Sequence, residues 1–269
     1  MDFATAFHRE ILAFEAAARR AADGGTSPLV PSCPGWSTAD LVLHLGGVHR
    51  FVTRIIEDGL TEPPDVTDVA VFGLPEERAG WPAPEGGPHR GAVPPGLVEW
   101  FADGARALEA HFRHGDPDQR VWTWSREQTA GFWWRMQTIE AALHRWDAES
   151  AIGAPGPVEA ALAADAIVQT FQIMAPARRA WKEAPPGAGE RFRLRRTDGP
   201  GVWTVSFEGD EVRLDGDADA SNGAPDLELT GTASDLMLFL WQRIPVDRLD
   251  GVRGDPAMAD RYFTLVPPV

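Results

Sequence analysis

The chain has 269 residues, which is enough to bury one large hydrophobic core or two smaller ones. Its formal net charge of -15 argues against a nucleic-acid partner, because binding to phosphates needs a basic surface. The single cysteine, Cys33, excludes an internal disulfide framework and a cysteine-rich zinc site. Charged residues interrupt the N-terminal region, and no segment is long and apolar enough to span a bilayer, so we expect a cytoplasmic protein without a membrane partner.

The first half of the sequence predicts four amphipathic helices. Apolar residues recur at helical period in a segment that begins at Phe3 and in the segments Ser37–Asp58, Leu97–Phe112 and Glu127–Glu149. Ser37 is a good N-cap for the second helix, with Asp40 as the carboxylate three positions later. The stretch Thr61–Pro95 is rich in proline and glycine and is interpreted as a long loop, which either covers a pocket or is a passive excursion. Four such helices can close a bundle with a polar site between facing helices.

The second half predicts a different architecture. The run Gly153–Pro157 is the best domain boundary, and we divide the chain into residues 1–155 and 156–269. A helix is expected over Val158–Trp181. Beyond it, alternating apolar residues predict a β-meander over Phe192–Arg196, Trp203–Phe207 and Val212–Leu214, and one more strand over Leu227–Thr230. A helix is expected over Ser234–Arg243. The expected fold class is α+β, with an N-terminal four-helix bundle followed by a smaller α+β domain.

Candidate metal ligands lie on the second and fourth predicted helices. Glu140 and His144 are four residues apart, so both project from one face of a helix and can reach a single ion. Burying a carboxylate there is costly unless it is paired or bound to a cation. A third ligand should come from a neighbouring helix, where His44 and His49 lie on opposite flanks of the apolar stripe. The helical period does not choose between these two histidines.

The same residues have simpler interpretations. A glutamate and a histidine at this spacing often occur by chance, and a histidine beside an apolar stripe is usually a hydrogen-bonded core or boundary residue. Asp147 is either a ligand, a group that orients an imidazole, or an ion-pair partner of an arginine such as Arg145. Cys33 lies in a proline-flanked turn with no histidine nearby in sequence, which favours a structural role over a nucleophilic one.

Several motifs resemble one known family. The segment Pro31–Leu45, which contains Cys-Pro-Gly-Trp and His44, and the Glu-x-x-x-His-x-x-Asp pattern that starts at Glu140 resemble the maleylpyruvate isomerase family of mycothiol-dependent enzymes. These enzymes belong to the wider DinB-like metal-binding helical bundles. Three C-terminal segments resemble the family's second, sterol-carrier-like domain; they are Gly231–Leu236, Leu240–Arg243 and Val252–Asp255. The resemblance covers nearly the whole chain, apart from the middle between Glu62 and Val93.

The resemblance implies a site and its cofactors. It assigns His44, Glu140 and His144 as ligands of a divalent metal, for which zinc is the first choice. His49 then becomes a residue that lines the pocket or supports a bound cofactor. Mycothiol is implied as the thiol cosubstrate, and the C-terminal domain is expected to complete the pocket.

Three arginines are candidates for binding anions. Arg135 and Arg145 flank the ligand pair and either bind a carboxylate of the cosubstrate or substrate, or form ion pairs. By resemblance, Arg243 near the end of the C-terminal helix faces the active site across the domain interface, which makes it the catalytic and anion-binding candidate. The alternative for Arg243 is a structural salt bridge to Asp247 or Asp250.

The implied function is metal-assisted thiol chemistry on a small electrophile, expected to carry a carboxylate, by an isomerase or an S-transferase. The enzyme is expected to be a monomer or a small homo-oligomer. Two alternatives are a non-enzymatic metal- or ligand-binding protein and a metal-assisted hydrolase with water in the open position. Dependence of turnover on a thiol separates the first function from both.

Overall fold

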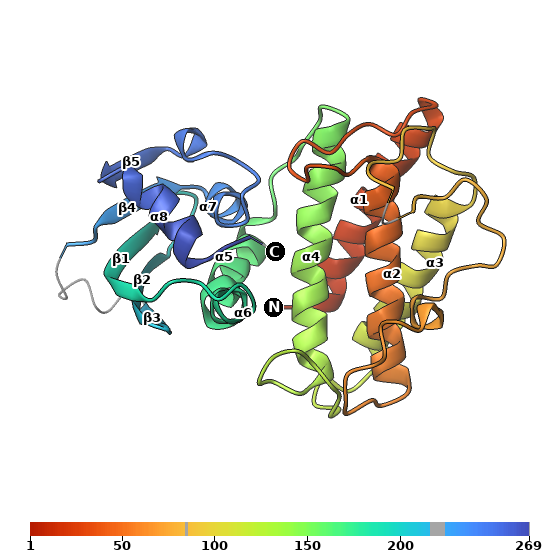
Figure 1. Cartoon of the computed structure of the whole chain (residues 1–269), viewed down its shortest axis with the longest axis horizontal. Coiled ribbons are helices and arrows are strands. Elements are labelled where there is room, and N and C mark those ends of the chain that lie inside the picture. The colour runs from red at the N-terminus through yellow and green to blue at the C-terminus, as the bar shows by residue number, and fades with distance from the viewer. Residues whose placement is uncertain (84–85, 216–223, 269) are drawn as a thin grey trace. The chain divides into compact units, whose positions relative to one another are not determined.

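The computed structural model of the chain describes residues 1–83, 86–215 and 224–268. The chain forms two compact units, Met1–Gly156 and Pro157–Val269, whereas the boundary predicted from the sequence lay between residues 155 and 156. The first unit is helical, and the second combines helices with a sheet (Figure 1). Among the residues that the structure describes, no helix has the length and apolarity that crossing a bilayer requires.

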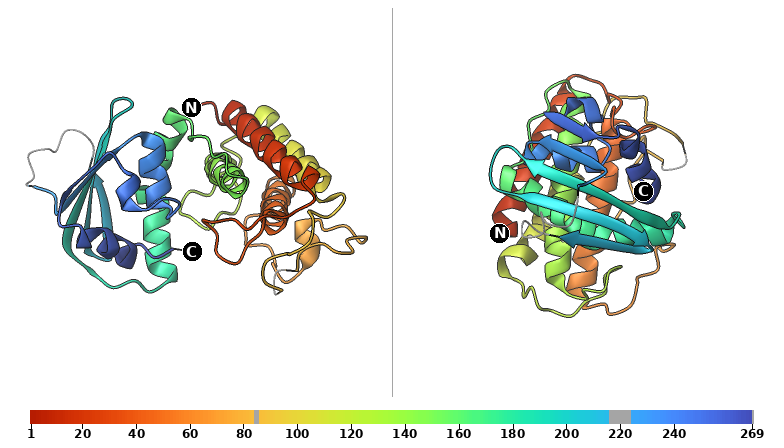
Figure 2. Two further views of the ribbon diagram at one scale, coloured as in Figure 1. Left: turned by 90° about the horizontal axis from the view of Figure 1, so that it is seen from above. Right: turned by 90° about the vertical axis from the view of Figure 1, so that its left-hand side faces the viewer.

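The described residues of the first unit form four long helices. They are α1 (Phe3–Asp23), α2 (Thr38–Glu57), α3 (Leu97–His114) and α4 (Ala130–Ala151), with a short 3-10 helix, η1 (Val69–Phe72), between α2 and α3. Around the bundle, α1 packs on α4, α4 on α2, α2 on α3 and α3 on α1 (Figure 2). Side chains of the predicted apolar stripes fill the core, among them Phe7, Phe14, Leu45, Phe101 and Ile139. Hydrophobic burial of these stripes therefore assembles the bundle.

Side-chain caps set where α2 and α4 begin. Ser37 and Asp40 form the predicted capping box, in which the Asp40 carboxylate accepts a hydrogen bond from the Ser37 amide at 2.8 Å. The fourth helix was predicted to start at Glu127. It starts at Ala130 instead, because the Thr129 hydroxyl accepts a hydrogen bond from the backbone amide of the first turn.

The long segment between α2 and α3 is held against the bundle by aromatic and polar contacts. The Trp100 indole on α3 donates to the Gly73 carbonyl at 2.9 Å. The Arg50 guanidinium on α2 lies over the same indole, 4.2 Å from its ring centroid. The backbone amide of His89 donates to the Asp40 carboxylate at 2.9 Å. The segment is thus fixed to both of the helices that it connects.

The second unit begins with helical turns over the segment that was predicted as one helix. These are α5 (Ala160–Gln169), the π-helical turn η2 (Thr170–Met174) and α6 (Ala175–Trp181). Pro176 near the start of α6 has no amide hydrogen to donate to the preceding turn. The wider π turn directly before it accommodates this missing hydrogen bond.

Among the described residues of the second unit, a five-stranded sheet follows, with the strand order β3-β2-β1-β4-β5. Its strands are β1 (Gly187–Arg196), β2 (Val202–Gly209), β3 (Glu211–Asp215), β4 (Leu227–Gly231) and β5 (Gly251–Gly254). The first three form the predicted antiparallel meander, whereas β4 pairs in parallel with β1. Alternation of apolar residues is the same in both kinds of pairing, so the sequence pattern did not reveal the direction of β4.

Helices lie on one face of this sheet (Figure 2). Helix α7 (Ala233–Leu240) ends before the predicted Arg243, because Gln242 adopts a φ of 58° and the Arg243 amide bonds back to the Leu238 carbonyl at 2.8 Å. Strand β5, the 3-10 helix η4 (Val246–Arg248) and α8 (Ala257–Leu265) were not predicted. Tyr262 of α8 is buried and packs on Phe192 and Phe207 of the sheet.

Substitution of Gly46 tests the close approach of α2 to α3. A Cβ atom added at Gly46 would come within 2.3 Å of a Trp100 ring carbon, whereas one added at Gly47 would meet only the Phe72 ring, at 3.7 Å. Gly46→Ala should lower the free energy of unfolding by about 1–3 kcal/mol, because overpacking forces the helix or the indole to move. Gly47→Ala is the matched control and should be neutral or stabilising, since alanine has the higher helix propensity. Urea unfolding measures both, and equal stability of the two variants would contradict the packing.

Candidate metal centre

The three predicted ligands converge between α2 and α4. One ligand atom from each of His44, Glu140 and His144 lies within 4.8 Å of the other two. Glu140 Oε1 is 3.3 Å from His44 Nε2 and 3.9 Å from His144 Nε2. Zinc–ligand distances of about 2.0–2.2 Å place the donor atoms of a tetrahedral site about 3.3–3.6 Å apart. The three side chains therefore fit one divalent cation after small adjustments.

Two elements of the bundle position these ligands. Glu140 and His144 are one helical turn apart on α4, so they share a face of that helix. His44 reaches the cluster from α2, where its ring packs against Trp36 with 4.8 Å between the ring centroids. The rings of His44 and His144 meet edge to face at 5.1 Å. These ring contacts restrict the orientation of the His44 imidazole.

Asp147 orients the imidazole of His144. Its carboxylate is fully buried and lies 3.0 Å from His144 Nδ1, which leaves His144 Nε2 on the side of Glu140. The Ser32 hydroxyl donates to the other Asp147 oxygen at 2.5 Å, and the Cys33 thiol donates toward Asp147 from 3.5 Å. Of the three roles predicted for Asp147, these contacts favour the orientation of an imidazole.

Burial and neighbouring charges set the protonation of the cluster. Burial raises the pKa of the Glu140 carboxyl, but the hydrogen bond with His44 and the positive charges of the nearby histidines lower it to about 2. Burial lowers the pKa of His144, although the contact with Asp147 opposes this shift. Gln137 donates to Glu140 Oε2 at 2.9 Å and leaves Oε1 toward the histidines. At neutral pH Glu140 is therefore ionised and His144 neutral, which are the forms that bind metals.

His49, the other candidate histidine, lies in the core of the bundle. It is 0% exposed, and its ring packs between Phe7 and Phe101, with centroid distances of 5.2 and 5.6 Å. Neither ring nitrogen has a hydrogen-bond partner among the described residues, and burial lowers the pKa of His49 to about 3. A side chain in this environment contacts aromatic core residues, and the role of His49 at the pocket or at a bound cofactor stays a prediction.

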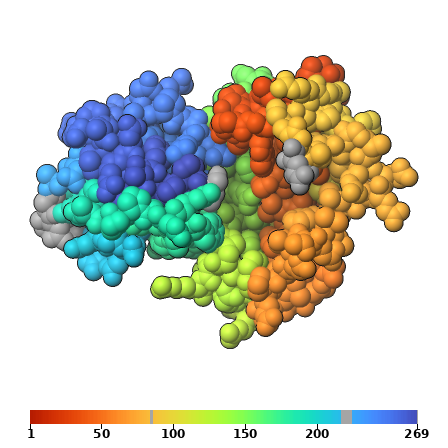
Figure 3. All heavy atoms as spheres, in the orientation of Figure 1, coloured from red at the N-terminus to blue at the C-terminus, as the bar shows by residue number. Residues whose placement is uncertain are grey.

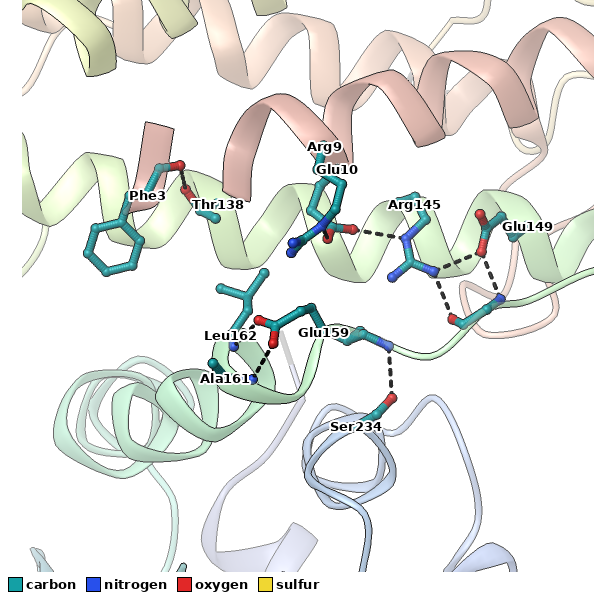
Figure 4. Close-up of polar contacts among 12 residues, drawn as sticks. Phe3, Arg9, Glu10, Thr138, Arg145, Glu149, Glu159, Ala161, Leu162 and Ser234 are labelled. Atoms are coloured by element: carbon teal, nitrogen blue, oxygen red, sulfur yellow. Dashed lines mark hydrogen bonds and ion pairs between the residues drawn. The ribbon is translucent and has the colours of Figure 1, made fainter. Parts of the chain in front are cut away.

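Arg145 is held by two carboxylates of the first unit. Its guanidinium donates to Glu10 at 2.9 Å, to Glu149 at 2.8 Å and to the Gly156 carbonyl at 2.7 Å (Figure 4). Both Arg145 and Glu10 are buried. These contacts favour the structural alternative, an ion pair, over the binding of an external anion. Arg135 is partly exposed on α4, and its role in anion binding stays a prediction.

Arg243 lies in the second unit, just after α7 and near another arginine. Its Nη1 donates to the Trp241 carbonyl at 2.9 Å. The Arg178 guanidinium stacks on the Trp241 ring, 4.2 Å from the centroid, and only 3% of Arg178 is exposed. Burial and the charge of Arg243 lower the pKa of Arg178 to about 10. Asp250, one of the two acids considered as a salt-bridge partner, accepts a hydrogen bond from the Thr197 hydroxyl at 2.9 Å.

A cavity of about 610 Å³ adjoins the cluster, and His44 forms part of its wall. The rest of the wall comes from the turn before α2, from α2 itself and from the segment between α2 and α3. Atoms of this segment, coloured orange to yellow, form an outer surface of the first unit in Figure 3. The structure thus favours the first interpretation of the long loop, in which it covers a pocket.

Sequence reasoning missed several residues of this region. Gln137 lies three positions before Glu140 on the same face of α4, so helical spacing was a usable signal. Ser32 had no such signal, because its partner Asp147 is distant in sequence. Arg78 and Trp81 line the cavity from a segment without periodicity, and only the folded chain identifies them.

Comparison with known proteins identifies the family. Residues 7–149 match the model of the mycothiol maleylpyruvate isomerase N-terminal domain, and residues 161–261 match that of the MDMPI C-terminal domain. The chain belongs to this family. The family predicted from the motifs is confirmed, and it is a family of enzymes. No curated protein matches the chain.

Solved structures show the same fold. One is a crystal structure of the mycothiol-dependent maleylpyruvate isomerase, with a TM-score of 0.58, 12% identity, and coverage of 93% of this chain and 90% of that chain. Another is a crystal structure of a histidine-to-alanine mutant of the mycothiol-dependent maleylpyruvate isomerase. Its TM-score is 0.57 at 12% identity, and the match covers 92% of this chain and 90% of that chain. The predicted α+β fold class is therefore confirmed.

Alanine replacement of His44, Glu140 or His144 should each abolish stoichiometric metal binding. The reason is that two remaining ligands bind a divalent ion much more weakly than three. Elemental analysis of the purified variants after dialysis measures the metal content. Retention of full metal content by any of the three variants would remove that residue from the ligand set.

His49 provides the control. His49→Ala should retain the metal, and so should His49→Leu, which keeps a comparable volume and removes two buried nitrogens without partners. The free energy of unfolding of His49→Leu should equal or exceed that of the wild type, because an unsatisfied buried polar group is lost. If His49→Leu lost the metal while His44→Ala kept it, the assignment of the two histidines would be reversed.

Proposed function

We propose that this family member is a metal-dependent thiol enzyme that uses mycothiol as a cosubstrate and acts as an isomerase or S-transferase on a small electrophile. The observation that carries the proposal is the convergence of His44, Glu140 and His144 beside a cavity. Two histidines and one carboxylate are the donor set of many catalytic zinc sites, which keep one position open. The matched family, named for mycothiol, supports a thiol as the molecule that enters there.

The chain's own residues prepare this site. Asp147 engages Nδ1 of His144 and Gln137 engages one Glu140 oxygen, so His144 Nε2 and Glu140 Oε1 are left for the metal. A divalent ion in this site, with zinc as the first choice, would lower the pKa of a bound thiol and so supply a thiolate at neutral pH. Cys33, the single cysteine, is engaged with Asp147. We therefore infer that the reactive thiol belongs to a small molecule.

The proposed chemistry is nucleophilic catalysis by the thiolate. In an isomerisation, sulfur bonds to one carbon of a cis double bond conjugated with a carbonyl group, and the π electrons move onto the carbonyl. Rotation about the resulting single bond and expulsion of the thiolate restore the double bond in the trans geometry. In an S-transfer, the sulfur stays bonded and a leaving group departs with its electron pair. Both reactions begin with the same thiolate, so the ligand set does not distinguish them.

We also propose that Arg243 binds a carboxylate of the substrate. Arg243 and Arg178 both contact Trp241, so two guanidinium groups concentrate positive charge in one region of an acidic protein. A guanidinium fork binds a carboxylate through two parallel hydrogen bonds. Arg135 is a further candidate for an anion contact. We propose that the enzyme acts in the cytoplasm on small molecules, as a monomer or a small homo-oligomer.

Thiol consumption tests the proposed function. Purified enzyme with stoichiometric metal should accelerate the loss of mycothiol, or the thiol-dependent isomerisation of a cis double bond, when it is given a panel of electrophiles. The Glu140→Ala variant should lose this activity together with the metal, because Glu140 supplies the anionic ligand. Equal turnover with and without thiol would favour a metal-assisted hydrolase, and metal binding without any turnover would favour a binding protein.

Replacement of Arg243 tests the anion contact. Arg243→Ala should keep the bound metal and the melting temperature but lose most thiol-dependent turnover of a carboxylate-bearing substrate. Arg243→Lys should restore only part of it, because a point charge does not reproduce the guanidinium fork. Arg248→Ala, which removes an exposed arginine a few residues away, is the control and should keep full activity. Full activity of Arg243→Ala, or a loss explained by unfolding, would refute the contact.

A further inference from the structure

The cavity beside His44 has a largely apolar wall. Its volume of about 610 Å³ lies within the range of about 300–1,000 Å³ that is typical of small-molecule sites. Most of the lining side chains are aromatic or aliphatic; among them are Trp36, Leu43, Val48, Phe72 and Trp81. A ring-bearing molecule would bury its surface against these groups without leaving polar atoms unpaired.

The polar side chains of the wall offer little to a multiply charged ligand. Asp40 is an acid and repels anions, and its Oδ2 already accepts hydrogen bonds from the backbone amides of Ser37 at 2.8 Å and His89 at 2.9 Å. Among the lining residues that the structure describes, Arg78 is the single arginine or lysine. Arg78 is exposed and donates to the Pro75 carbonyl at 2.9 Å. The cavity therefore suits an uncharged, ring-bearing part of a molecule, and not a small dicarboxylate.

The wall that faces α2 is pre-formed. Trp81 packs against Trp100 with 5.5 Å between ring centroids, and Phe72 stacks on Phe51 at 6.0 Å. The hydrogen bond from Trp100 to Gly73 holds the chain between these two aromatic contacts. A ligand thus enters a cavity whose aromatic side chains are already ordered, which reduces the entropic cost of binding.

The thiol does not suit this cavity. Mycothiol is large and polar, and an apolar wall leaves its hydroxyl groups without hydrogen bonds, at a cost of about 1–3 kcal/mol for each unsatisfied group. His44 belongs both to the cluster and to the cavity wall. A molecule in the cavity therefore lies next to the cluster, where the electrophile has to be when the thiol occupies the open position.

We propose that this cavity binds the hydrophobic, ring-bearing part of the electrophile, so that the enzyme prefers an aryl electrophile with at most one carboxylate over a small dicarboxylate. The proposal rests on the proposed thiol chemistry of the same site and adds a substrate class to it. Trp36 and Trp81 supply the aromatic wall that holds the ring, and the carboxylate of the substrate is left for the proposed contact with Arg243.

Two variants and a matched control test the cavity by binding. Val48→Trp fills the cavity from α2, and Trp81→Ala removes part of its aromatic wall. The control, Val66→Trp, makes the same substitution at a position that is 59% exposed in the neighbouring segment. The probe is anilinonaphthalene sulfonate, which carries aromatic rings and one anionic group. Its Kd should rise about tenfold or more in both cavity variants and stay unchanged in the control. Unchanged binding in Val48→Trp and Trp81→Ala would overturn the proposal.

Turnover then tests the substrate class. With mycothiol as the thiol, kcat/KM for chlorodinitrobenzene should exceed that for maleylpyruvate, and Val48→Trp should lower the former by about tenfold or more while it retains the metal. In this reaction sulfur bonds to the ring carbon and chloride departs with the electron pair. A preference for maleylpyruvate would overturn the proposal. The two proposals can fail separately. If the cavity variants lost probe binding but the wild type showed no thiol-dependent turnover, the thiol function would be refuted and the aryl-binding cavity would be supported.

Discussion

The partly buried carboxylate of Glu140, between α2 and α4, is the constraint on which the rest of the site depends. An ionised carboxylate between two helices costs several kcal/mol unless cations or hydrogen-bond donors surround it. His44 and His144 approach one of its oxygens, and Gln137 donates to the other. Charge compensation of this kind explains why α2 and α4 each contribute polar side chains to an otherwise apolar helix interface.

The arrangement extends outward from Glu140 through His144 to Asp147. Asp147 is fully buried, and it connects α4 to the turn before α2 through contacts with Ser32 and Cys33. The proline-flanked turn that carries the family motif therefore has a structural reason to lie beside the later motif. Its polar side chains hold the carboxylate that orients the His144 imidazole.

Within the first unit, the helices and the segment between α2 and α3 have different roles. The helices hold the ligand cluster, whereas this segment supplies much of the wall of the adjoining cavity. Trp100 and Arg50 fix the segment to the bundle, so its irregular backbone does not imply a loose wall. Sequence changes in such a segment alter the shape of the cavity without disturbing the ligands, which is how one scaffold accommodates different substrates.

Local patterns in the sequence by themselves determined the four helices, the capping box of Ser37 and Asp40, the antiparallel meander and the common face of Glu140 and His144, because these depend on residues a few positions apart. The helical period left open whether His44 or His49 joins the cluster, and the family resemblance favoured His44. The tertiary structure decided it, because His44 lies beside Glu140 whereas His49 packs between Phe7 and Phe101. It also decided the parallel pairing of β4 with β1 and the pairing of Arg145 with Glu10. These contacts join segments far apart in the chain, and they form only when hydrophobic burial packs whole helices and strands together.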